Sequence, residues 1–211
     1  MRTIWKWAVV LAVPAIWVAA AWPQEPAHPE GTTVKLLLLR QKSVQKELEI
    51  SADVAQKIMA FTDEQSEAAG NAIAMPKDQR KAAFEQLKEK NKKFLADTLN
   101  AKQNTRLNQL YLQFTAPYQL TRAETAKALN LTADHQQKCK DLYKEHRKEM
   151  GEILFSKDNA GRAEKFAKLR AKTRARILSI LNEKQQAQAR EAVGAPFMGE
   201  LVFEENESAK K

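Results

Sequence analysis

Residues 127–139 read KALNLTADHQQKC, and residues 46–58, which lie 81 positions earlier, read KELEISADVAQKI. Six of the 13 aligned pairs are identical, and the pairs Ile50/Leu131 and Ser51/Thr132 keep their chemistry. Three later blocks match in the same order at offsets of 79 to 82: 84–87 with 166–169, 99–103 with 181–185, and 116–118 with 195–197. Loop insertions and deletions produce such a drift in offset. The sequence therefore predicts a tandem duplication.

Two of these blocks, which supply four sites in the two copies, have the form of a helix start. An apolar residue precedes Ser, Thr or Asn, whose side chain can accept from the free amides of the first turn. A Gln three positions later can accept from the amide of the capping residue, which completes a capping box. The sequence predicts complete capping boxes for Asn100 with Gln103 and for Asn182 with Gln185. Ser51 and Thr132 are also predicted caps, but Val54 and His135 occupy the third position after them, so the glutamine of the box is absent there.

The composition predicts an all-α fold. The chain has 6 Gly and 7 Pro, lacks strand-like alternation, and is rich in Ala, Leu, Lys, Glu and Gln, which favour helix. Each copy is expected to be a helical hairpin of about 80 residues, preceded by a short helix and followed by a capped one. The expected helices are 34–48, 51–74, 77–98 and 100–114 in the first copy, and 121–129, 132–155, 162–180 and 182–193 in the second.

The first 21 residues have the order of a secretory signal peptide. Arg2 and Lys6 precede an apolar segment at 7–18, which is short for a membrane span and is followed by three alanines at 19–21. We expect a mature chain that starts near Trp22 in the periplasm or another extracytoplasmic space, and an uncleaved anchor is the alternative. The predicted organisation is a signal peptide at 1–21, a disordered spacer at 22–32, repeats at 33–118 and 119–203, and a disordered tail at 204–211.

A helix start of the Leu-Thr-x-x-Gln type, repeated in a small, basic, exported helical chain, resembles the periplasmic Spy/CpxP family. The chain looks like duplicated relatives in which two units are fused. The resemblance implies an all-α cradle, ATP-independent chaperone or stress-adaptor activity, and no catalytic residues. Because family members are expected to pair two chains, we expect a monomer whose two copies pack about a pseudo-twofold axis. A homodimer is the alternative.

The helix expected at 162–180 carries most of the candidate binding residues. The formal net charge of +9 falls to +7 when Arg2 and Lys6 leave with the signal peptide. The predicted partner-binding face, opposite the buried stripe of this helix, consists of Arg162, Lys165, Lys168, Lys172 and Arg176. Such a face suits unfolded or acidic proteins or an anionic membrane surface, and an ordinary solvated face is the alternative. Nucleic acid is not an expected partner, because an exported protein does not meet the usual nucleic-acid targets and the sequence has no known nucleic-acid recognition motif.

Metal binding is an alternative that the sequence leaves open. His135 and Cys139 lie one helical turn apart and could share Zn²⁺ or Cu, whereas His146 lies too far along the helix. Their counterparts in the first copy belong to a buried stripe, so we interpret Cys139 as a small core residue and predict no cofactor. A metal-responsive protein and a structural envelope component therefore remain alternative functions. The sequence contains no phosphate-binding loop, nucleophile motif or metalloprotease His pair that would indicate an enzyme.

Overall fold

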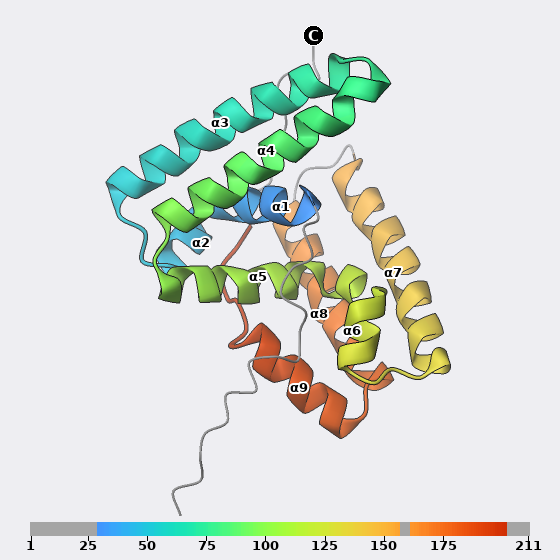
Figure 1. Cartoon of the computed structure of the whole chain (residues 1–211). Helices are drawn as coiled ribbons and strands as arrows, with labels where there is room; N and C mark the ends of the chain where they lie inside the picture. The colour runs from blue at the N-terminus through green and yellow to red at the C-terminus, as the bar shows by residue number, and fades with distance from the viewer. Residues whose placement is uncertain (1–28, 157–160, 202–211) are drawn as a thin grey trace, which may run out of the picture.

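The computed structural model describes residues 29–156 and 161–201, which form nine helices and no strand (Figure 1). The all-α prediction is therefore confirmed. The helices are α1 (Pro29–Leu39), α2 (Lys42–Glu47), α3 (Ala52–Ala74), α4 (Lys77–Thr98), α5 (Ala101–Gln119), α6 (Ala123–Ala128), α7 (Ala133–Leu154), α8 (Arg162–Ile180) and α9 (Glu183–Val193). Within these ranges, no helix combines the length and the apolar character that a membrane span requires.

Two helical hairpins, α3 with α4 and α7 with α8, dominate the architecture. Helix α5 runs between them in Figure 1 and contacts α1 on one side and α7, α8 and α9 on the other. Helix α1 packs against α3, α4 and α5. Because α5 contacts elements of both halves, it positions the second hairpin relative to the first.

All four predicted caps occupy the first position before a helix. The Ser51 Oγ accepts from the Val54 amide at 3.4 Å, and the Thr132 Oγ1 accepts from the His135 amide at 3.2 Å. The two asparagines form complete capping boxes, with hydrogen bonds of 2.9 to 3.0 Å: Asn100 with Gln103 before α5, and Asn182 with Gln185 before α9.

The capping glutamines also make tertiary hydrogen bonds that the motif does not reveal. The Gln103 Nε2 donates to the Leu48 carbonyl at 3.0 Å, and the Gln185 Nε2 donates to the Leu129 carbonyl at 3.0 Å. Both carbonyls belong to the residue directly after a short helix, α2 or α6. The next residue in each case, Glu49 or Asn130, has a left-handed backbone with φ near 50°. Each glutamine thus fixes a helix start and a sharp turn together.

Buried apolar residues form two clusters. The larger lies among α1, α2, α3, α4 and α5 and includes Leu39, Val44, Ile58 and Leu110. It also includes Leu201, which follows α9 and lies far from the other members in the sequence. The smaller cluster consists of Leu120, Ala126, Leu129, Leu131, Cys139 and Leu181. The C-terminal segment therefore completes a core that belongs mainly to the first half of the chain.

Three expected boundaries are wrong. Helix α1 begins at Pro29, inside the stretch expected to be a disordered spacer, because Thr32 is already buried against the core. The single helix expected at 34–48 is broken into α1 and α2 at 40–41. Helix α5 continues past the expected end at 114 to Gln119, and it includes Pro117, which is buried in the structure. The expected signal peptide and the tail at 204–211 lie outside the described residues.

Candidate functional site

The five cations predicted to form a partner-binding face all lie on α8, but three of them are paired with carboxylates. Two of the partners belong to α7, so packing of α7 against α8 neutralises much of this face. Lys165 is exposed, and Arg162 donates to the Ser156 carbonyl at 3.3 Å. The ion pairs are Lys168–Glu164 at 2.6 Å, Lys172–Glu149 at 2.7 Å, and Arg176–Glu145.

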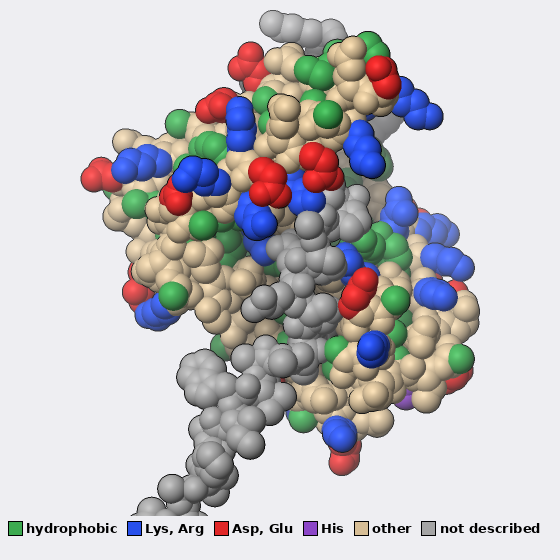
Figure 2. All heavy atoms as spheres, viewed as in Figure 1, with side chains coloured by type: hydrophobic (Ala, Val, Ile, Leu, Met, Phe, Trp, Pro, Cys, Tyr) green, Lys and Arg blue, Asp and Glu red, His purple; other side chains and the backbone are tan. Residues whose placement is uncertain are grey.

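The ion pairs on this face also affect protonation. A hydrogen bond from Arg176 lowers the pKa of Glu145, and a hydrogen bond from Lys168 lowers the pKa of Glu164. Both carboxylates therefore stay charged at neutral pH and offset the cations beside them. On the face shown in Figure 2, carboxylates and cations also lie interspersed over α3 and α4. This mixture differs from the single-sign surface that a predominantly electrostatic binding site requires.

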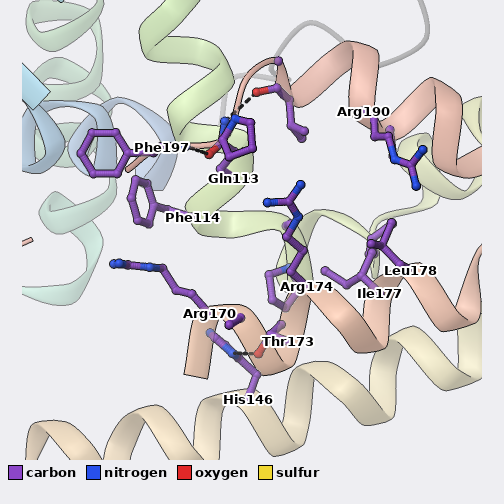
Figure 3. A pocket seen from close by; sticks show the side chains of 18 of the residues that line it. Gln113, Phe114, His146, Arg170, Thr173, Arg174, Ile177, Leu178, Arg190 and Phe197 are labelled. Carbon is purple, nitrogen blue, oxygen red and sulfur yellow. Dashed lines mark hydrogen bonds between the residues drawn. The ribbon is translucent and has the colours of Figure 1, made fainter. Parts of the chain in front are cut away.

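A second set of cations lines a pocket of about 460 Å³. Helices α5, α8 and α9 and the segment at 194–199 form its walls, and Figure 3 shows the side chains that line it. The described residues that line it are mostly apolar and include no acidic residue. Its principal apolar residues are Phe114, Pro117, Leu120, Ile177, Leu178, Leu181, Val193, Phe197 and Met198, and its three cations are Arg170, Arg174 and Arg190.

The segment at 194–199 is held in place by one side chain of α5. The Gln113 Nε2 donates to the Val193 carbonyl at 2.7 Å and to the Ala195 carbonyl at 2.8 Å. The Gln113 Oε1 accepts from the Phe197 amide at 2.9 Å. The Phe197 ring then packs edge-on against the Phe114 ring, with centroids 5.6 Å apart. This clamp sets the position of one wall of the pocket.

Gly194 lies directly after α9, where the chain turns into this wall. It has φ 63° and ψ −161°, a backbone conformation that strains residues with a side chain. A Cβ at this position would lie 2.4 Å from the Gln109 Oε1. The backbone conformation therefore favours glycine here, and any larger residue would also displace the end of the Gln109 side chain.

The arginines of the pocket have few partners. The Arg170 guanidinium lies 5.5 Å from the centroid of the Phe114 ring, and burial lowers its pKa. Arg190 donates to the Gln186 Oε1 at 3.1 Å. Arg174 makes no hydrogen bond or ion pair in the described part of the chain. The pocket thus combines apolar walls with positive charge that no carboxylate of the described residues neutralises.

His146 lies in the wall of the same pocket. Its Nδ1 is 2.9 Å from the Thr173 Oγ1, and both side chains are buried between α7 and α8. Burial lowers the pKa of His146, and the Glu149 carboxylate offsets this effect in part. The neutral imidazole is therefore the form that this site favours.

Cys139, half of the alternative metal site, lies in the smaller core cluster with 0% of its surface exposed. Burial raises the pKa of the Cys139 thiol to about 11. Since metals bind the thiolate, this environment disfavours a ligand role for Cys139. The His135 Nδ1 is buried without a hydrogen-bond partner among the described residues. Across residues 29–156 and 161–201, no three His, Cys, Asp or Glu side chains cluster as metal ligands.

The ends of both hairpins expose large apolar side chains. At the end of α3, Ile73 is 60% exposed and Met75 is also exposed. At the end of α7, Phe155 is 88% exposed and Leu154 is also exposed. These residues lie outside the pocket. Each hairpin thus presents apolar surface at the turn between its two helices.

The arginines of the pocket are not among the site residues predicted from the sequence. Arg170 and Arg174 are one helical turn apart, and Ala167 and Ala171 share their face, which is a pattern of small and basic residues that the sequence does show. Its meaning depends on α5 and α9, which cover that face.

Comparison of the chain with protein-family models, curated proteins and solved structures finds no match.

Proposed function

We propose that the protein is a non-enzymatic protein of the cell envelope that binds unfolded or acidic protein partners, as a chaperone or a stress adaptor. The observation that carries this proposal is the exposure of large apolar side chains at the ends of both hairpins. Exposed apolar surface costs solvation free energy, and its retention is typical of sites that bind other proteins. An unfolded partner offers the complementary apolar segments.

The charges beside the hairpin ends suit the same partners. Lys77 and Arg80 follow the end of α3, and Arg162 and Lys165 follow the end of α7. Arg80 donates to the Met75 carbonyl at 3.0 Å, which places its charge next to an exposed apolar residue. A partner segment that carries both apolar and acidic side chains can contact both kinds of group.

We further propose that the chain arose by fusion of two Spy-like units. The helices α2, α3, α4 and α5 and the helices α6, α7, α8 and α9 follow one another with similar caps, and both sets are preceded by corresponding turns. The left-handed residues lie 81 positions apart, and the tertiary bonds of the capping glutamines recur. On this proposal, a single chain supplies both halves of the binding surface and acts as an exported monomer.

An aggregation assay tests the binding proposal. The purified mature chain, residues 22–211, is mixed with a chemically denatured client protein, and light scattering is followed as the client refolds. We expect the protein to reduce scattering and the double variant Ile73→Ser/Phe155→Ser to lose most of this effect. Leu37→Ser, which removes an exposed leucine elsewhere, is the matched control. Equal activity of the double variant and the control would exclude the hairpin ends as the binding surface.

A further inference from the structure

The pocket between α5, α8 and α9 has the features of a ligand site distinct from the hairpin ends. Its volume of about 460 Å³ is within the range of small-molecule sites, roughly 300 to 1,000 Å³. Like such sites, it has mainly apolar walls and a small number of polar groups. Among its described lining residues, the charged side chains are all arginines, and His146 lies in an environment that favours its neutral form.

The arrangement of charge on α8 separates this site from the rest of the helix. The cations Lys168, Lys172 and Arg176 are paired with carboxylates. Arg170 and Arg174 lie on the pocket side and have no carboxylate partner in the described structure. These two sets of cations on one helix therefore have different environments: a carboxylate neutralises each member of the first set, whereas no described carboxylate neutralises Arg170 or Arg174.

The geometry also places an apolar path beside the cations. Figure 3 shows Arg174 extending from α8 toward the segment at 194–199 and Arg170 extending along the side of the pocket where Phe114 lies, with Ile177 and Leu178 further along the same helix. Phe114 lies beside the Arg170 guanidinium, which burial has partly desolvated. Arg170 is half-buried and Arg174 is exposed. The planar guanidinium of an arginine can form bidentate bonds with a carboxylate or phosphate, and partial desolvation of Arg170 strengthens such bonds.

We propose that this pocket binds a single-chain amphiphile with an anionic head group. The head group, a carboxylate or a phosphate, binds Arg170 and Arg174, and Arg190 adds positive charge at the α9 side. The alkyl chain packs among Ile177, Leu178 and the other apolar residues of the walls. A neutral or cationic amphiphile of the same length gains the apolar contacts but leaves the arginines unpaired, so it binds more weakly.

The test uses isothermal titration calorimetry of the mature chain with four twelve-carbon amphiphiles below their micelle concentrations. Dodecanoate and dodecyl phosphate are the anions, and dodecanol and dodecyltrimethylammonium are the neutral and cationic counterparts. We expect at least one anion to bind about tenfold or more tightly than both counterparts. The stronger anion identifies the head group. Equal binding of all four, or no binding of either anion, would overturn the proposal.

Paired variants of α8 locate the site. Arg170→Gln/Arg174→Gln removes two charges from the pocket, and Lys168→Gln/Lys172→Gln removes two from the paired face of the same helix. We expect the first pair to weaken anion binding by about tenfold or more and the second to change it by less than about threefold. Equal losses would show that the anion responds to overall charge and not to the pocket. Circular dichroism of both variants verifies that they are folded. The comparison of head groups uses the wild-type protein alone and does not depend on the variants.

Discussion

Gln185 allows the two roles of the capping glutamine to be separated by a change of one atom. Its Oε1 accepts from the Asn182 amide at 3.0 Å, whereas its Nε2 donates to the Leu129 carbonyl at 3.0 Å and the Asn130 carbonyl at 3.3 Å. The variant Gln185→Glu keeps the acceptor for the helix start and removes the donor. The negative charge also lies favourably at the start of α9. Any loss of stability must therefore come from the tertiary contact.

The magnitude follows from the burial of this contact. Gln185 is buried, and a buried carbonyl without its donor costs about 1–3 kcal/mol, with more when a charged group faces it. We expect Gln185→Glu to lower the free energy of unfolding by about 3 kcal/mol. Gln103 makes the corresponding bond to the Leu48 carbonyl but is only half-buried, so water can replace the lost donor. We expect Gln103→Glu to cost about 1 kcal/mol.

Urea denaturation followed by circular dichroism measures both variants against the wild-type chain. At low pH the protonated glutamic acid regains a hydrogen-bond donor. The loss of unfolding free energy in Gln185→Glu relative to wild type should therefore shrink, while the helix content of the variant stays constant. Equal losses for the two variants, or a loss below about 0.5 kcal/mol at position 185, would refute the reasoning, since surface substitutions have effects of that size.

Three other variants test separate features. Gln113→Ala removes the three bonds that hold the segment at 194–199, and we expect protease cleavage there and a loss of about 1–3 kcal/mol. Because burial lowers the pKa of His146, the unfolded chain takes up the proton first, and the wild type should lose stability as pH falls below the ordinary pKa of 6.5. Melting temperatures measured across this pH range should vary less for His146→Gln than for the wild type. Cys139→Ala should cost about 1 kcal/mol through lost packing, with no change on addition of Zn²⁺; a rise in wild-type melting temperature that the variant lacks would restore the metal hypothesis.

The parts of the fold that follow from short-range chemistry were predictable. A cap forms between residues three positions apart, so Asn182 and Gln185 identify their helix start from sequence alone. The stripe that includes Cys139 was predictable for the same reason, because helical periodicity assigns it to the buried side. The break between α1 and α2 was not, since leucines on both sides of it continue the apolar pattern.

The candidate site depends on contacts between distant segments. The bonds of Gln113 span 80 to 84 residues, and no local pattern predicts that this glutamine closes a pocket wall. The net charge of the α8 surface likewise depends on its neighbour. Lys172 has no acidic partner nearby in the sequence, but it forms an ion pair with Glu149 once α7 packs beside α8. Packing against α7 therefore neutralises Lys172 and Arg176, which have no acidic neighbour one turn away in the sequence.

The burial of Leu201 in the first core has a consequence for the order in which the protein can mature. A chain emerges from the ribosome from its N-terminus, and early segments generally fold first. Here the core built by α1, α2, α3, α4 and α5 is complete only when residue 201 arrives, after α6, α7, α8 and α9 have been made. The Ser43 hydroxyl, which donates to the Glu200 carbonyl, secures the same late closure. The two halves thus share a final step, and a chain cut short before Leu201 lacks part of its first core as well as its last segment.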